Sequence, residues 1–153
     1  AAMVKSAIDT GDALDEMSQR VGISVETLSV WKPAAEQSGV SGESFEKGLR
    51  KLSTTMLEAA TGSEEAARNF AAVGVAFKNQ DGTLRGTDQV LLDLAERFKA
   101  MPDGAEKSAL AGQIFGEAEA ELIPFLNQGR DGITELTDEL RSLGIEMSDE
   151  SAA

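Results

Sequence analysis

The chain has 153 residues, enough for one domain with a substantial core, and its 27 Asp and Glu against 14 Lys and Arg give a formal net charge of -13. This charge disfavours nucleic acid as a partner, because neutralising phosphates needs clustered cations. Cys and His are absent from the sequence, which excludes disulfides, thiol nucleophiles, Cys/His zinc sites and histidine acid–base chemistry.

The first part of the chain, residues 1–74, is predicted to be a helical half. Apolar residues at three- and four-residue steps predict an amphipathic helix that stops at Gly22, with a stripe formed by Val4, Ile8, Leu14, Met17 and Val21. Ser24 is expected to cap a second helix. Pro33 interrupts this helix, so that it either kinks there or ends near Trp31.

The third helix of this half has the clearest pattern. Its apolar face steps by four and three residues through Phe45, Leu49, Leu52, Met56 and Ala59. Gly62 follows as a stop signal. Ser63 is expected to open a short fourth helix, with acidic residues in its first turn, that ends at Gly74.

A β-hairpin is predicted near residues 75–85. Two short apolar or β-prone runs, 75–77 and 83–85, flank a polar loop that contains the turn dipeptide Asp81-Gly82. This hairpin would separate the two helical parts of the chain.

The remaining residues, 86–147, are predicted to be a second helical half. Thr87-Asp88 is expected to cap a helix that turns its apolar residues inward, namely Leu91, Leu94, Ala95 and Phe98. Asp103 and Glu106 resemble a capping box for the next helix, whose apolar residues are Leu110 and Ile114 and which ends at Gly116. Two further helical runs follow, 117–126 with Pro124 inside it and a last one ending at Gly144 with Ile133, Leu136, Leu140 and Leu143.

The predicted fold is therefore all-α, a multi-helix bundle of about eight short helices with one small β-hairpin. Aromatic residues make up only 5% of the sequence, so we expect most of them to anchor the core: Trp31, Phe45, Phe70, Phe77, Phe98, Phe115 and Phe125. No membrane span is expected, because the longest run without a polar side chain, 70–77, is far shorter than the ~18 residues that a span needs. We treat residues 1–153 as a single segment excised from a longer protein, since both ends read as cut within helical sequence.

The Asp81-Gly82 loop has some features of a calcium site. With Gly82 at the sixth position of an EF-hand loop, Asn79 and Asp81 occupy ligand positions three and five. The first ligand position then falls on Phe77 and the twelfth on Asp88 in place of Glu. A loop without its first carboxylate binds calcium poorly, so a structural turn is the preferred interpretation.

Other charged residues offer no distinct chemistry. Candidates for an acid–base pair of carboxylates come from two groups, Glu117, Glu119 and Glu121, or Glu64 and Glu65. Residues one or two apart on a helix do not face each other, so a solvated helix face is the preferred interpretation. The cations Lys47, Arg50 and Lys51 are expected to form surface ion pairs, with an anion site as the alternative. We therefore predict no enzymatic activity, no catalytic, cofactor-binding or metal-binding residue, and no cofactor.

The order of short segments along the chain resembles tail tape measure proteins of long-tailed phages and prophages. The resemblance is strongest between residues 74 and 129, where DGTLR at 81–85 and MPDGAEK at 101–107 stand out, and it runs through 7–10, 12–15, 18–28, 34–39, 52–53, 59–63, 91–95, 120–124 and 127–129. The sequence departs from that family at residues 31–33, and at Gly42, Gly48 and Gly112, where helix formers are usual.

This resemblance implies a structural, non-enzymatic virion protein. Tape measure chains set the length of the tail tube during assembly and leave it ahead of the genome at ejection. The implied partners are the tail tube protein, tail assembly chaperones and other tape measure chains, and the implied location is the lumen of the virion tail after assembly in the host cytoplasm. The alternative is a helical interaction module that recruits chaperone or tube proteins and measures nothing. The isolated segment is expected to collapse on itself or to oligomerise, and the working form to be more extended.

Overall fold

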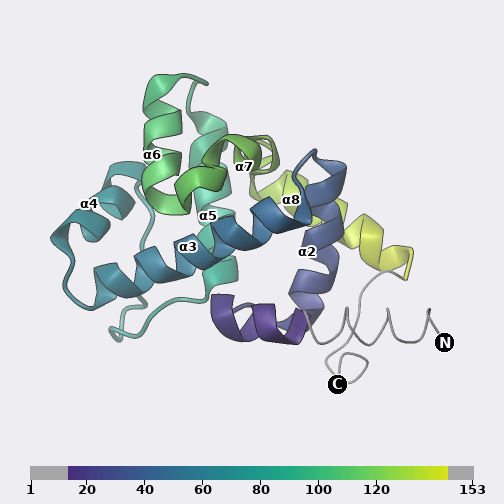
Figure 1. Cartoon of the computed structure of the whole chain (residues 1–153), viewed down its shortest axis with the longest axis horizontal. Coiled ribbons are helices and arrows are strands. Elements are labelled where there is room, and N and C mark those ends of the chain that lie inside the picture. The colour runs from purple at the N-terminus through teal and green to yellow at the C-terminus, as the bar shows by residue number, and fades with distance from the viewer. Residues whose placement is uncertain (1–13, 145–153) are drawn as a thin grey trace.

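A computed structural model of the chain describes residues 14–144 and is mostly helical (Figure 1). Residues 14–21 are helical, and the elements after them are α2 (Val25–Gln37), α3 (Gly42–Ala60), α4 (Glu64–Val73), α5 (Thr87–Ala100), α6 (Ala105–Phe115), the short 3-10 helix η1 (Gly116–Ala118), α7 (Glu119–Leu126) and α8 (Gly129–Ser142). The all-α prediction is confirmed. The part of the first predicted helix before residue 14 lies outside the described residues.

The finer predictions of about eight helices and a β-hairpin are not confirmed. Among residues 14–144, the predicted hairpin contains only an isolated antiparallel bridge between Lys78 and Leu84, and no strand. The chain does reverse there, because the Asn79 N–H donates to the Thr83 carbonyl at 2.7 Å and the Arg85 N–H donates to the Phe77 carbonyl at 3.0 Å. An isolated two-stranded ribbon is marginal in water, and this one stays a hydrogen-bonded loop.

Serine hydroxyls begin the first three of the labelled helices. Ser24, Ser41 and Ser63 each accept the N–H of the residue three positions later, at 3.2, 3.1 and 3.2 Å. This satisfies one of the N–H groups that a helix start leaves without an intrahelical partner. The predicted caps Ser24 and Ser63 are therefore confirmed.

The two caps predicted in the second half are wrong. The N-cap residues of α5 and α6 are Gly86 and Gly104, and neither helix start has a side-chain cap. Asp103 does not form the predicted capping box, because its carboxylate accepts a hydrogen bond from Lys107. An ion pair with an ammonium is stronger than a hydrogen bond to a neutral backbone N–H, which accounts for the difference.

Helix α2 continues through Pro33 to Gln37, so the alternative in which it ends near Trp31 is wrong. Its buried residues lie on both sides of the proline, Trp31 before it and Ala34 and Ala35 after it. Packing of this apolar face supplies the stability that the missing proline N–H removes.

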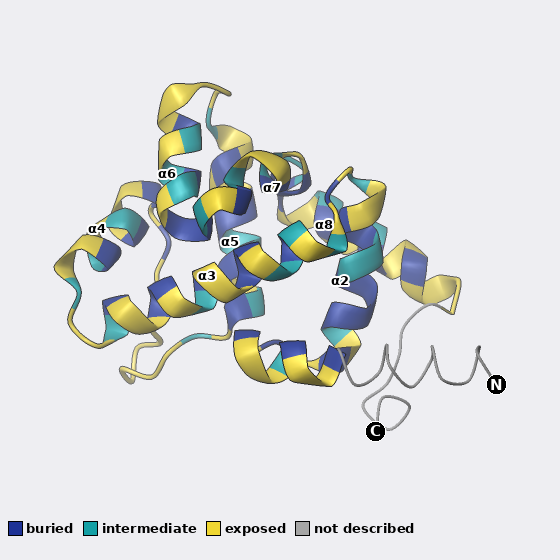
Figure 2. Ribbon diagram, viewed as in Figure 1, coloured by how far each residue is buried: buried dark blue, intermediate teal, exposed yellow. Residues whose placement is uncertain are grey.

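The core is organised around α3, which packs against α2, α4, α6, η1 and α7 and follows the long axis of the molecule in Figure 1. Figure 2 shows that the buried residues of the helices face one another in the interior. Six of the seven predicted anchors are buried, and Phe77 is half-buried. Phe45 and Phe125 meet edge to face with ring centroids 5.4 Å apart, an arrangement that stabilises beyond the area buried.

Gly48 allows α3 to approach α7 closely. A Cβ atom at this position would lie 2.1 Å from the Cδ1 atom of Leu122, which is itself buried. The sequence predicts Gly48 to weaken its helix, and the intrinsic cost of glycine over alanine is about 1 kcal/mol. The structure gives this glycine a packing role that offsets the cost. None of the helices in residues 14–144 has the length and apolar composition needed to cross a membrane.

Candidate interaction site

The Asp81-Gly82 loop closes on itself. The Asp81 carboxylate accepts the Thr83 hydroxyl at 2.6 Å and the Thr83 N–H at 3.0 Å, and these bonds lower the pKa of Asp81 below its ordinary value. Asn79, the other expected ligand, donates its side-chain N–H to Thr83 instead. Within residues 14–144, no group of three or more His, Cys, Asp or Glu is placed to hold a metal ion.

The glutamates considered for acid–base chemistry are not brought together as a pair in a cleft. Glu117 and Glu121 are exposed, as are Glu64 and Glu65. Glu119 differs from them, because its Oε2 atom is buried without a hydrogen-bond partner in the described part of the chain. Of the cations on α3, Lys47 forms an ion pair with Glu43 at 3.4 Å, one turn earlier on the same helix.

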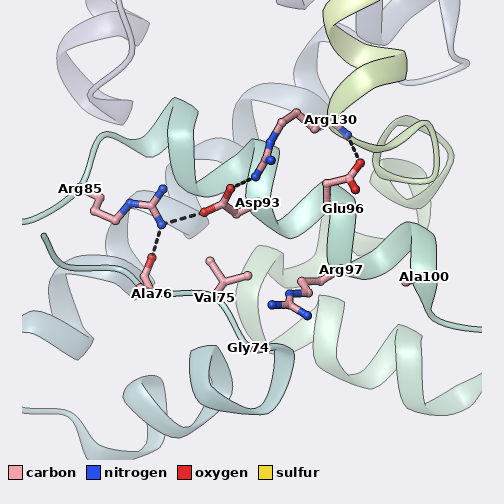
Figure 3. A pocket seen from close by; sticks show the side chains of 9 residues that line it. All are labelled: Gly74, Val75, Ala76, Arg85, Asp93, Glu96, Arg97, Ala100 and Arg130. Atoms are coloured by element: carbon pink, nitrogen blue, oxygen red, sulfur yellow. Dashed lines mark hydrogen bonds and ion pairs between the residues drawn. The ribbon is translucent and has the colours of Figure 1, made fainter.

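A larger feature is an open cavity of about 560 Å³ that the sequence does not predict. We call it the arginine cavity, and its wall comprises Gly74, Val75, Ala76, Arg85, Asp93, Glu96, Arg97, Ala100 and Arg130 (Figure 3). These residues come from the end of α4, the loop after it, one face of α5 and the start of α8. Three guanidinium groups and two carboxylates leave the wall with one positive charge in a chain whose formal charge is -13.

Asp93 holds two of the three arginines. Its Oδ2 atom accepts from Arg85 at 2.8 Å, and its Oδ1 atom pairs with Arg130. The same Arg85 nitrogen donates to the Ala76 carbonyl at 2.7 Å, which ties the loop after α4 to α5. Asp93 thus connects three segments, and its charge is matched by guanidinium groups on both oxygens.

Glu96 is matched by the start of α8. Its Oε1 atom accepts the Arg130 backbone N–H at 2.8 Å, although α8 has no cap from its own N-cap residue. A carboxylate at a helix N-terminus satisfies a free N–H and complements the helix dipole. Gly129 makes this approach possible, since a Cβ atom there would lie 2.7 Å from Glu96 Oε1.

Arg97 is the charged group of the cavity that lacks such a partner. No acceptor in residues 14–144 pairs with its side chain, which is exposed, and Figure 3 shows it extending from α5 towards Gly74. Gly74 is the left-handed C-cap of α4, and a Cβ atom on it would lie 3.5 to 3.7 Å from three atoms of the Arg97 guanidinium group. Because Gly74 has no Cβ atom, space remains between it and the Arg97 guanidinium group, which lines the open cavity.

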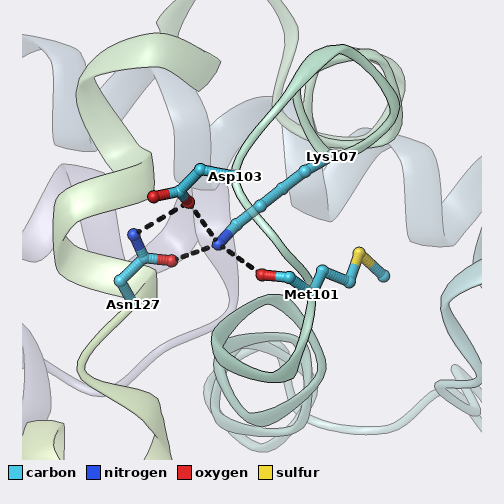
Figure 4. Close-up of polar contacts among 4 residues, drawn as sticks. All are labelled: Met101, Asp103, Lys107 and Asn127. Atoms are coloured by element: carbon cyan, nitrogen blue, oxygen red, sulfur yellow. Dashed lines mark hydrogen bonds and ion pairs between the residues drawn. The ribbon is translucent and has the colours of Figure 1, made fainter.

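A second polar feature is the Lys107 cluster, formed by Met101, Asp103, Lys107 and Asn127 (Figure 4). The Lys107 Nζ atom donates to the Asn127 side-chain carbonyl at 2.6 Å, to Asp103 Oδ1 at 2.8 Å and to the Met101 backbone carbonyl at 3.2 Å. Three acceptors match the three N–H groups of an ammonium, so this buried cation is fully satisfied. Lys107, followed by Asn127, lowers the pKa of Asp103 below its ordinary value.

Sequence reasoning did not find either feature. Arg130 follows Arg97 by 33 residues, and only the packing of α8 on α5 brings it to the cavity that Arg85 and Arg97 also line. The four-residue spacing of Asp103 and Lys107 was a usable signal, because a carboxylate just before a helix start can reach a cation in the first turn. No family model, no curated protein and no solved structure matches this chain.

Proposed function

We propose that the chain is a segment of a tail tape measure protein, a structural and non-enzymatic component that sets tail-tube length and is released ahead of the genome. The observation that carries this proposal is the ordered resemblance, which spans most of the chain from residue 7 to residue 129. The helical fold is compatible with it. The proposed partners are the tail tube protein, tail assembly chaperones and other tape measure chains, within the tube lumen.

The test is an in-frame deletion of this segment from its parent gene, with tails measured by electron microscopy. As an extended helix, 153 residues contribute about 230 Å at about 1.5 Å per residue. As a compact unit of radius of gyration about 15 Å, the segment contributes about 40 Å at most. Deletion should shorten the tail and tandem duplication should lengthen it by the same amount. Tails of unchanged length in both strains would overturn the ruler role.

The size of the change also reports the state of the segment in the tube. An extended form must give up contacts between α3 and the helices around it, because these bury the central phenylalanines Phe45 and Phe125. That apolar surface would need new cover from the tube wall or from neighbouring tape measure chains. We propose that the working form is more extended, so the deletion should remove well over 40 Å.

The alternative, a helical interaction module that measures nothing, is favoured by one observation, the positively charged arginine cavity on an acidic chain. On this alternative, deletion abolishes recruitment of a tail protein and leaves assembled tails at full length. A cell-wall hydrolase is the third class. It requires activity on peptidoglycan that is lost in Glu121→Gln, and a purified chain without such activity excludes it.

A further inference from the structure

We propose that the arginine cavity binds a carboxylate side chain of a partner protein, with Arg97 as the residue that pairs with it. The inference does not depend on the tape measure role, because it rests on the charges and contacts of the cavity alone. It states which chemical group the cavity binds, whereas the proposed function states only that the chain has partner proteins.

The first step is the balance of charge inside the cavity. Asp93 pairs with Arg85 and Arg130, and the Oε1 atom of Glu96 accepts the Arg130 backbone N–H. Both carboxylates of the wall therefore already have a partner within the fold. Arg97 is left as a cation without an acceptor among the described residues, at the edge of a space of about 560 Å³. An incoming anion therefore meets a net positive site and displaces no internal ion pair.

The second step is the preference for a carboxylate. A guanidinium group offers parallel N–H donors that match the two oxygens of a carboxylate, and such bidentate pairs are stronger and more directional than single contacts. Gly74 has no side chain beside the Arg97 guanidinium group, and this leaves the group accessible to a ligand. The α8 N-terminus at the same cavity adds positive potential.

The third step is the source of the carboxylate. The cavity volume falls within the range of about 300–1,000 Å³ that is usual for ligand sites, and it is larger than one carboxylate group needs. Its wall also contains the apolar side chains of Val75, Ala76 and Ala100. This combination suits an acidic residue whose peptide neighbours place aliphatic groups against the apolar wall. A small free dicarboxylate has no such groups and would leave that wall uncovered.

The experiment is a titration of the purified 15N-labelled chain, followed by backbone amide and arginine Nε–H resonances. The probe is a capped tripeptide with glutamate between two alanines, and the matched control peptide has glutamine in its place. We expect saturable shifts at Arg97, Ala76 and Ala100 with the glutamate peptide, with a millimolar dissociation constant that rises with salt. The glutamine peptide should produce no saturable shift.

The variants separate pairing from general attraction. Arg97→Gln should weaken binding of the glutamate peptide about tenfold or more, and Arg97→Lys should weaken it less, since the charge stays and the fork is lost. The control is Arg68→Gln, which removes an exposed arginine of α4 outside the cavity and should bind as the wild type does. Equal binding by the wild type and Arg97→Gln would overturn the proposal, as would the absence of saturable shifts.

Two further probes test the chemical class. Glutarate carries carboxylates without a peptide, and tighter binding of glutarate than of the glutamate peptide would overturn the assignment to a partner protein. Inorganic phosphate tests the preference for carboxylate. Phosphate that competes as strongly as the peptide at equal concentration would overturn that preference. These titrations use the purified chain, so their outcome does not depend on whether deletion of the segment changes tail length. Failure of the ruler role and failure of the carboxylate site are therefore distinguishable.

Discussion

The arginine cavity lies along α5 and the Lys107 cluster includes the loop that follows α5, yet the two sites differ in how completely their charges are satisfied. Lys107 is buried, with an exposed fraction of 3%, and each of its three N–H groups has an acceptor. In the cavity, Asp93 and Glu96 each have a partner, and Arg97 is exposed with no partner among residues 14–144. The difference shows that charged residues have two roles in this fold. The closed Lys107 cluster fixes the packing of the helices, and the open arginine cavity has a charged group that is available to a ligand.

The largest expected effect is at the closed cluster. Lys107→Ala should lower the free energy of unfolding by about 3 kcal/mol, because it leaves a cavity and removes the donor for three acceptors. Lys107→Met keeps most of the aliphatic volume and should cost about 1–2 kcal/mol. Urea unfolding followed by circular dichroism measures both. A Lys107→Met variant as stable as the wild type would show that Lys107 stabilises the fold through the packing of its aliphatic chain, and that the ammonium adds nothing.

A smaller effect is expected at Asp93. Asp93→Asn should lower the free energy of unfolding by about 1 kcal/mol, because its ion pairs are partly solvated and such pairs stabilise little. Glu135→Gln, which changes an exposed carboxylate on α8, is the control and should leave stability unchanged. A loss at Asp93 as large as that of Lys107→Ala would remove the distinction between the open and the closed cluster.

The sequence was sufficient to predict the helices whose apolar residues repeat regularly and whose starts carry a serine. Periodicity in α3 and the caps at Ser24 and Ser63 both depend on neighbours a few residues apart, so local reasoning finds them. The role of Gly48 depends on Leu122, more than seventy residues away, and no local pattern reports such a contact. The reversal at Asp81-Gly82 was found, but whether its flanks pair as strands depends on cover from other elements.

The same limit explains the candidate site. No local pattern predicts the burial of Lys107, because a lysine on a helix is ordinarily exposed and its burial here depends on Asn127 from the end of α7. Arg97 belongs to an ordinary amphipathic helix, and its lack of an acceptor becomes visible only when α4 and α8 are placed beside it. The sequence pattern around these side chains does not report their partners. Only the tertiary structure separates a satisfied charge from an available one.

A pH dependence is expected at the closed cluster. The pKa of Asp103 is lowered in the folded state, chiefly by Lys107, so unfolding raises its affinity for protons. Its contribution to stability is therefore fully present above its ordinary value of 3.8 and is lost as the pH falls through the lower folded value. Urea midpoints of the wild type and Asp103→Asn, measured between pH 6 and pH 2, should converge at the acidic end. Parallel curves would contradict this assignment.

The smallest effect on stability, near zero, is expected for Arg97→Gln. The side chain is exposed and pairs with no described residue, so its removal breaks no hydrogen bond or ion pair within residues 14–144. Exposed substitutions of this kind usually change the free energy of unfolding by less than about 0.5 kcal/mol. Unfolding measurements on variants of Lys107 and Arg97 therefore compare the two cations directly. The cation with three acceptors should stabilise the fold, and the cation without a described partner should not. A loss of more than about 1 kcal/mol in Arg97→Gln would mean that Arg97 already has a partner within the fold, at the C-terminal carbonyls of α4, and is not available to a ligand.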